Sequence, residues 1–142
     1  LLFTAETLQT AIRVICPEGA FLGHEGGDDF VLMVDAAHAE RLGEEIVKRF
    51  DSGAAAFYSE DEAEQGYIEA FDRQGNPIRY PLATLSMAGV RLLTYDFHRF
   101  LEVASVCAEV KHVAKSRPGS LLFMDRRGKA ITADVGSADP VP

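Results

Sequence analysis

Two adjacent glycines, Gly26 and Gly27, constrain the fold of this chain more than any other feature. They stand between two short runs of β-forming residues, 20–24 and 29–34, and acidic residues flank them on both sides. A tight turn between antiparallel strands needs positive φ, which glycine adopts without steric cost. The sequence therefore predicts a β-hairpin with carboxylates at its tip. We expect His24, just before the tip, to hydrogen-bond across this hairpin, with a role as a metal ligand as the minor alternative.

Apolar residues recur at helical spacing in three other segments of the chain. The first helix is predicted to have Thr4 as its cap and to end at Pro17. The second is predicted to follow Asp35 as its cap and to stop near Gly53, with charged residues on its outer face. The third is predicted over 97–116, before a Pro-Gly pair that breaks it.

The remaining segments predict strands and loops. An acidic stretch, 53–65, is predicted to be a surface excursion without regular structure. Strands are predicted over 67–72 and 78–93, where they form a second hairpin, and over 121–124. Helices that alternate with strand pairs predict an α/β (α+β) fold, in which a mixed central β-sheet is flanked by helices.

Length and composition fit one domain over 1–125, followed by a loose C-terminal tail over 126–142 that is poor in large apolar residues. Acidic residues outnumber basic ones by 22 to 14, which argues against nucleic acid as a partner. No apolar run reaches the ~20 residues that a membrane span needs. Cys16 and Cys107 are predicted to be reduced thiols, as expected for a cytoplasmic protein.

The segment 21–31, Phe-Leu-Gly-His-Glu-Gly-Gly-Asp-Asp-Phe-Val, resembles the signature hairpin of GGDEF domains. Active members of that family condense two GTP molecules into cyclic di-GMP. The segment 84–90 is similar to the family's T-x-S-x-G-[VI] strand, and Ala114, Lys115 and Gly119 resemble the A-K-x-x-G that ends its last helix. These landmarks stand in the family's order, so the resemblance implies a nucleotide-cyclase fold of the GGDEF type. The insertion before the 84–90 strand is similar to a divergent branch found on multidomain signalling proteins.

The resemblance implies a nucleotide site at the hairpin tip. Gly26 and Gly27, which have no Cβ atoms, would let a triphosphate lie against the backbone. Lys115 matches a lysine that contacts GTP phosphates in the family. Lys111 lies one helical turn before it, so the two lysines form either a phosphate-facing pair or a solvated face.

Two carboxylates carry the implied catalytic roles. Asp28 maps to the metal-binding position of the motif, where it would hold Mg²⁺ together with the phosphates, and it is also the candidate base. Asp29 maps to the next position, at which most active members have Glu. Its side chain is shorter by one methylene, and a misplacement of about 1 Å can cost on the order of 100-fold in rate.

Other departures from the family weaken the enzymatic expectation. Ser120 stands where an arginine usually follows the helix-ending glycine. Pro17 and Ala20 occupy the positions of the product-inhibition motif R-x-x-D. Residues 1–16 match the helix directly before the signature hairpin, so the family's first strand and helix, with a second metal-binding carboxylate and the guanine-reading residues, lie outside this chain.

Three functions follow as hypotheses. The first is a degenerate GGDEF domain that regulates or dimerises in cyclic di-GMP signalling behind an upstream sensory or receiver domain, and that binds GTP with Mg²⁺ as a homodimer. The second is an active diguanylate cyclase in the intact protein, with Asp28 as metal ligand and base, Asp29 as its partner and Lys115 on phosphate. The third is an unrelated α/β binding domain.

Overall fold

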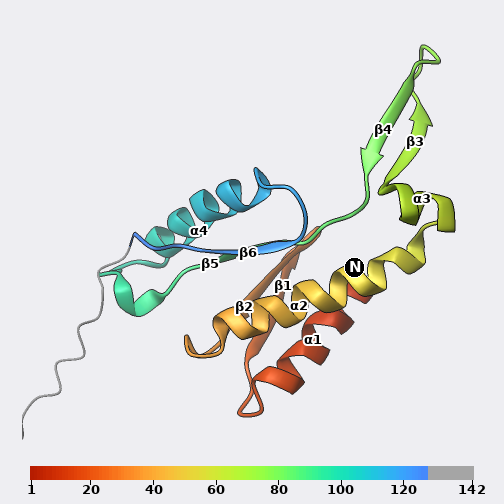
Figure 1. Ribbon diagram of the computed structural model, residues 1–142. Coiled ribbons are helices and arrows are strands. Elements are labelled where there is room, and N and C mark those ends of the chain that lie inside the picture. The colour runs from red at the N-terminus through yellow and green to blue at the C-terminus, as the bar shows by residue number, and fades with distance from the viewer. Residues whose placement is uncertain (128–142) are drawn as a thin grey trace, which may run out of the picture.

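The structure, a computed structural model, describes residues 1–127 of the chain. It is an α+β arrangement in which helices and short strands alternate (Figure 1). The helices are α1 (Leu2–Ile15), α2 (Ala39–Ala54), α3 (Glu60–Gln65) and α4 (Phe100–Lys115), with short 3-10 turns η1 (Ala55–Phe57) and η2 (Leu92–Thr94). The strands are β1 (Phe21–Gly26), β2 (Asp29–Met33), β3 (Tyr67–Phe71), β4 (Pro77–Pro81), β5 (Ser86–Gly89) and β6 (Leu121–Met124).

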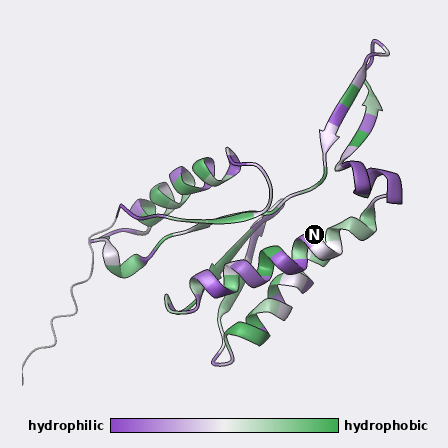
Figure 2. Ribbon diagram, in the orientation of Figure 1, coloured by the Kyte–Doolittle hydropathy of each residue, from purple (hydrophilic) through white to green (hydrophobic). Residues whose placement is uncertain are grey.

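The main hydrophobic core lies between α1, α2 and the strands beside them. Both helices place apolar residues at helical spacing, and these form one buried cluster. Partly buried side chains of β1, β2 and the β5 region pack against this cluster, among them Leu22, Phe30 and Met87. The opposite face of α2 is charged and exposed to solvent (Figure 2). The predicted apolar faces of the first two helices are therefore confirmed, whereas in α4 the predicted apolar positions Leu101 and Val113 are exposed and the buried residues are Val110 and Ala114.

The strands form three separate two-stranded ladders, not the single mixed central sheet that the sequence predicts. β1 pairs with β2 and β3 with β4, both antiparallel, whereas β5 and β6 pair in parallel. β6 packs closely on α2, because a Cβ atom at Gly43 would lie 2.4 Å from Leu122 Cδ2. Helices thus cover the strands as predicted, but the ladders do not join within the part of the chain that the structure describes.

Three predicted helix starts are wrong by a few residues. α1 begins at Leu2, so Thr4 lies inside the helix and does not cap it. α2 begins at Ala39, because Asp35 accepts a hydrogen bond from the Ala37 backbone and directs a turn before the helix starts. α4 begins at Phe100, three residues later than predicted.

The predicted long strand over 78–93 is divided into β4 and β5, which have different partners. β4 ends at Pro81, and the following linker leads away from the β3–β4 hairpin to the body of the molecule (Figure 1). The last residues of the predicted strand form η2. The second hairpin itself, β3 with β4, is confirmed.

The acidic stretch predicted as an irregular excursion contains a short helix, α3. Ser59 caps it: its Oγ accepts from the Glu62 backbone, and the Glu62 carboxylate accepts from the Ser59 backbone N–H. Gly66, with φ of 79°, ends the helix in the left-handed conformation. This reciprocal capping box stabilises a helix that has no apolar stripe.

Both cysteines are free thiols, as predicted, and burial raises the pKa of Cys16. No helix among residues 1–127 is long and apolar enough to cross a membrane. Most of the predicted tail, from residue 128 onward, lies outside the described residues. Its first two residues are described, and Arg127 is held in place by ion pairs.

Candidate functional site

The predicted tip of the first hairpin is confirmed as a glycine turn. Gly26 and Gly27 have φ of 126° and 58°, and Gly26 pairs with Asp29 after a register irregularity that follows His24. The His24 ring donates through Nε2 to the Gly27 carbonyl oxygen at 3.1 Å, which confirms the expected hydrogen bond across the hairpin. No side chain or backbone lies within 4 Å of where either glycine would carry a Cβ atom. The backbone of the tip is therefore open to a ligand.

The hairpin tip and helix α4 meet through charged side chains that lie far apart in the sequence. Lys111 Nζ donates to Asp29 Oδ2 at 2.5 Å. This hydrogen bond is the main reason why the pKa of Asp29 is lowered, and the positive charges of Lys111 and Lys115 lower it further. Three of the six predicted site residues, Asp29, Lys111 and Lys115, are thus brought together across the fold, and the other three adjoin Asp29 in the same turn.

The Asp29–Lys111 pair is only partly shielded from water. The side chains are 42% and 38% exposed, respectively. An ion pair at this exposure contributes little to stability, on the order of 0–1 kcal/mol. Its main effect is on local charge, since the Asp29 carboxylate neutralises one of the two predicted phosphate-binding lysines.

Asp28, the predicted metal ligand, is exposed at the turn itself. Among residues 1–127, no group of three or more His, Cys, Asp or Glu side chains is placed to hold a metal ion together. Mg²⁺ prefers about six oxygen ligands in octahedral geometry. The described residues therefore do not fit a metal site of their own, and Asp28 offers a single carboxylate.

Ser120, at the position where the resemblance leads one to expect an arginine, has a structural role. Its hydroxyl donates to Asp51 Oδ1 at 2.5 Å and accepts from the Leu85 backbone N–H at 3.0 Å. These bonds tie the loop before β6 to α2 and to the segment before β5. Ser120 therefore positions the two parallel strands and adds no positive charge near the hairpin tip.

A second polar cluster, which the sequence analysis missed, lies at the carboxyl end of β6. Asp125 is 7% exposed and accepts from the Tyr95 hydroxyl and from Arg127 Nε, which lies 3.0 Å from Oδ1. Arg127 also pairs with Glu109 of α4 at 2.7 Å. Because the guanidinium and the hydroxyl stabilise the carboxylate, the pKa of Asp125 is lowered to about 2. The signal in the sequence was an acid followed by two arginines after an apolar strand.

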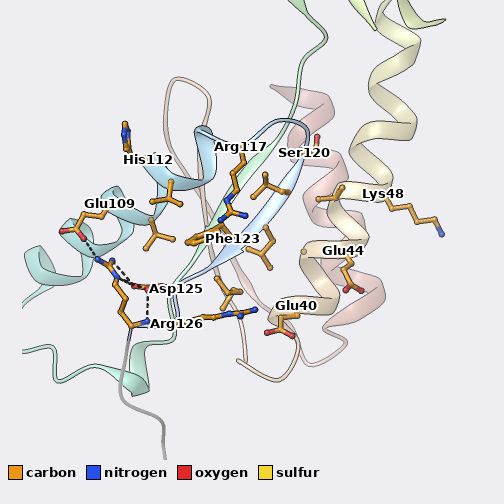
Figure 3. A pocket seen from close by; sticks show the side chains of 18 residues that line it. Glu40, Glu44, Lys48, Glu109, His112, Arg117, Ser120, Phe123, Asp125 and Arg126 are labelled. Carbon is orange, nitrogen blue, oxygen red and sulfur yellow. Dashed lines mark hydrogen bonds and ion pairs between the residues drawn. The ribbon is translucent and has the colours of Figure 1, made fainter. Parts of the chain in front are cut away.

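A wide hollow lies beside β6, between α2 and α4 (Figure 3). It measures about 1320 Å³, and acidic and basic side chains alternate around it, including Glu44, Lys48 and Arg117. None of the six predicted site residues lines it. Since its charges are mixed and it is widely open, it does not share the chemistry of a phosphate site, and the hairpin tip remains the better candidate.

No protein-family model matches the chain, no curated protein matches it, and no solved structure matches it. The likeness to GGDEF domains therefore rests on the sequence landmarks alone.

Proposed function

We propose that this chain is a degenerate GGDEF-type signalling domain, with regulatory and dimerising roles in cyclic di-GMP signalling, that holds GTP without converting it. The observation that carries the proposal is the ion pair between Asp29 and Lys111. It joins the acidic motif to helix α4.

The ion pair argues against catalysis at the tip. A carboxylate that accepts a hydrogen bond from an ammonium group has its pKa lowered, as the pKa of Asp29 is, and is a weaker base. To bind a metal or to accept a proton, Asp29 would have to give up Lys111. Because the Asp29 side chain is one methylene shorter than glutamate, it reaches Lys111 but extends less far toward a ligand at the turn.

The same arrangement leaves phosphate-binding groups in place. Lys115 contributes positive charge on the side of α4 that faces Asp29. The turn at Gly26 and Gly27 has backbone that a phosphate can approach closely. One lysine and an open glycine turn support binding of moderate strength, and Mg²⁺ enters this proposal only as a companion of the nucleotide phosphates.

The arrangement of the ladders leaves room for an additional strand beside the first hairpin. β2 and β5 both lie against the α1–α2 core, yet neither has a second ladder partner among the described residues. A further strand between them would join two ladders into one mixed sheet. This is consistent with the expectation, from the resemblance, of an additional strand that carries a second carboxylate.

The test is a calorimetric titration of GTP into the intact protein with and without Mg²⁺, followed by analysis of the products for cyclic di-GMP. We expect binding that depends on Mg²⁺ and no cyclic di-GMP. Lys115→Met should weaken binding about tenfold, as expected for loss of one charge-assisted contact. The matched control is Lys48→Met on α2, which removes the same charge away from the hairpin tip and should leave the affinity unchanged.

Two results would contradict the proposal. Cyclic di-GMP that forms with the wild-type protein and disappears with Asp28→Ala would establish an active cyclase. Absence of GTP binding at millimolar nucleotide would remove the nucleotide part of the proposal.

A further inference from the structure

The β3–β4 hairpin, called the arm here, projects from the rest of the molecule (Figure 1). Among the described helices and strands, only α3 packs appreciably against it. The Tyr58 hydroxyl, which accepts from the Ala83 backbone at 2.8 Å, fixes its base. A two-stranded ribbon without a third strand or a covering helix is marginally stable in water. A further strand packed against the arm would therefore stabilise it.

One face of the arm is apolar and only partly covered. Cross-strand pairs share a face of a ribbon, and successive pairs alternate between faces. The pairs Ile68–Tyr80 and Ala70–Ile78 form one face, which carries no charged residue. Tyr80 is 51% exposed.

The other face of the arm carries an ion pair and also Phe71, whose side chain is 74% exposed. Arg79 pairs with Glu69 at 3.1 Å, and its guanidinium lies 4.5 Å from the centre of the Tyr67 ring. The two faces thus differ in charge: one carries an ion pair beside the exposed Phe71, and the other carries no charged residue.

The hydrogen bonds at the two ends of the arm identify which backbone groups point outward. The Leu82 N–H donates to Gly66 O, and the Asp72 N–H donates to Asn76 O. In an antiparallel ladder, bonded pairs alternate with non-bonded pairs. The N–H and C=O groups at 67, 69 and 71 of β3, and the C=O groups at 77, 79 and 81 of β4, therefore point away from the ladder.

The two outer edges of the arm are not equivalent. On β4, two of the three outward positions are Pro77 and Pro81, which have no N–H to donate. On β3, all three outward residues have an N–H group. Natural sheets use proline to block edges, so β3 is the edge that can still accept a strand.

We propose that β3 pairs with β3 of a second copy of this chain, in antiparallel orientation, so that the two arms form a four-stranded sheet. The inference rests on the dimerising part of the proposed function and names the surface responsible. The pairing is self-complementary, as a two-fold symmetric contact requires. It also joins the apolar faces of two arms into one larger apolar surface.

Charge complementarity favours a second copy as the occupant and selects a register. Pairing centred on Ala70 keeps the two Glu69 carboxylates from standing directly opposite each other, an arrangement that is destabilising in sheets. In this register Arg73, at the tip of one arm, lies opposite Tyr67 at the base of the other. The base carries α3, whose exposed carboxylates are Glu60, Asp61 and Glu64.

The first experiment compares two proline variants by analytical ultracentrifugation of the intact protein. Glu69→Pro removes an outward N–H from β3, and Arg79→Pro removes one from β4. The two residues are cross-strand partners, so both variants lose the same ion pair, and neither loses a hydrogen bond of the ladder. We expect Glu69→Pro to raise the dimer dissociation constant at least about tenfold, and Arg79→Pro to change it less than about threefold.

A charge-reversal experiment tests the register independently of proline. Arg73→Glu should weaken the dimer about tenfold, since it places like charges at the partner's α3. Combining it with Glu60→Lys and Glu64→Lys should restore the affinity. Recovery supports the antiparallel pairing, and a combined variant as weak as Arg73→Glu alone overturns it.

The inference fails if the wild-type protein is monomeric, or if both proline variants dimerise equally well. Titration of GTP into Glu69→Pro separates the two proposals, because the arm contains no residue of the hairpin tip. A dimer insensitive to Glu69→Pro with GTP still bound overturns the arm contact alone. If the wild-type protein binds no GTP but its dimer is weakened by Glu69→Pro, only the nucleotide part of the proposed function is overturned.

Discussion

Helix α4 takes part in two acid–base clusters that differ in almost every physical respect. Through Lys111 it contacts Asp29 at the hairpin tip, where both side chains are about two-fifths exposed. Through Glu109 it contacts Arg127, which in turn binds the nearly buried Asp125. The first cluster belongs to the recognisable motif, whereas the second belongs to no motif.

The two clusters differ in how much each contributes to the stability of the fold. Asp125 accepts hydrogen bonds from the Tyr95 hydroxyl and from both the side chain and the backbone of Arg127. Because these bonds stabilise its charge and it is nearly buried, its ionisation is coupled to folding. Asp29 has one strong partner, and because water screens the pair, the pair adds little to the free energy of unfolding. The hairpin-tip motif therefore lies on a surface that the stability of the fold does not depend on. The cluster around Asp125, in contrast, holds the end of β6 in place.

The largest expected effect follows from neutralising the buried acid. Asp125→Asn should lower the free energy of unfolding by about 3 kcal/mol, since it removes charge-assisted bonds to Arg127 within a shielded site. Urea denaturation measures this effect. Glu109→Gln, which breaks the exposed contact to the same arginine, is the matched control and should cost less than about 1 kcal/mol. Equal losses would mean that the buried contact of Arg127 with Asp125 is worth no more than its exposed contact with Glu109.

The contribution of Asp125 to stability should also appear in the pH dependence of unfolding of the wild-type protein. The pKa of Asp125 in the folded protein is about 2, below its ordinary value of 3.8. A lowered pKa gives stability that is present above the ordinary value and is lost as the pH falls through the folded value. We expect this group to contribute roughly 2 kcal/mol that disappears between about pH 4 and pH 2. In Asp125→Asn that part of the pH dependence should be absent, and an unchanged acid limb would contradict the assignment.

Removing the hydroxyl that supports Asp125 should have an intermediate effect. Tyr95→Phe deletes one donor to the carboxylate but keeps the ring, which stacks on Phe97 with centroids 4.7 Å apart. The loss should be about 1 kcal/mol, and the pKa of Asp125 should rise, as measured by NMR titration of the carboxyl group. A Tyr95→Phe protein with an unaltered Asp125 pKa would show that the arginine alone sets it.

The smallest effect on stability is expected at the hairpin tip. Asp29→Asn should change the free energy of unfolding by less than about 1 kcal/mol. It frees Lys111, however, so GTP affinity should increase severalfold in the titration described above. Asp28→Asn, which removes the same charge from the adjacent position without breaking the Lys111 pair, is the control. Weaker GTP binding in Asp29→Asn would indicate that Asp29 itself helps to hold the nucleotide.

Local chemistry explains which parts of the fold were predictable. The glycine turn at Gly26–Gly27 and the amphipathic faces of α1 and α2 depend on residues close in sequence, and both are confirmed. The short helix α3 was missed because its capping box lies within an acidic run without apolar spacing. The division of 78–93 was missed because an apolar run continues across it, and β5 is defined by its pairing with β6, 35 residues later.

The candidate site shows a similar limit. The sequence indicates the lysines of α4 and the acids of the hairpin separately. It does not indicate that Asp29 and Lys111, 82 positions apart, form an ion pair. The Tyr95–Asp125–Arg127 cluster likewise joins segments that meet only when α4 packs on the β5–β6 ladder. Such contacts depend on tertiary structure, so composition and spacing do not predict them.

The prolines of β4 also determine how far strand pairing can extend. A ribbon with two open edges can add strands without end, which is how sheet-forming chains grow into fibres. In the arm, Pro77 and Pro81 leave one edge without two of its donors, so growth can proceed from β3 only. A strand that pairs with β3 therefore ends the assembly, and the exposed apolar arm is protected against polymerisation by its own sequence.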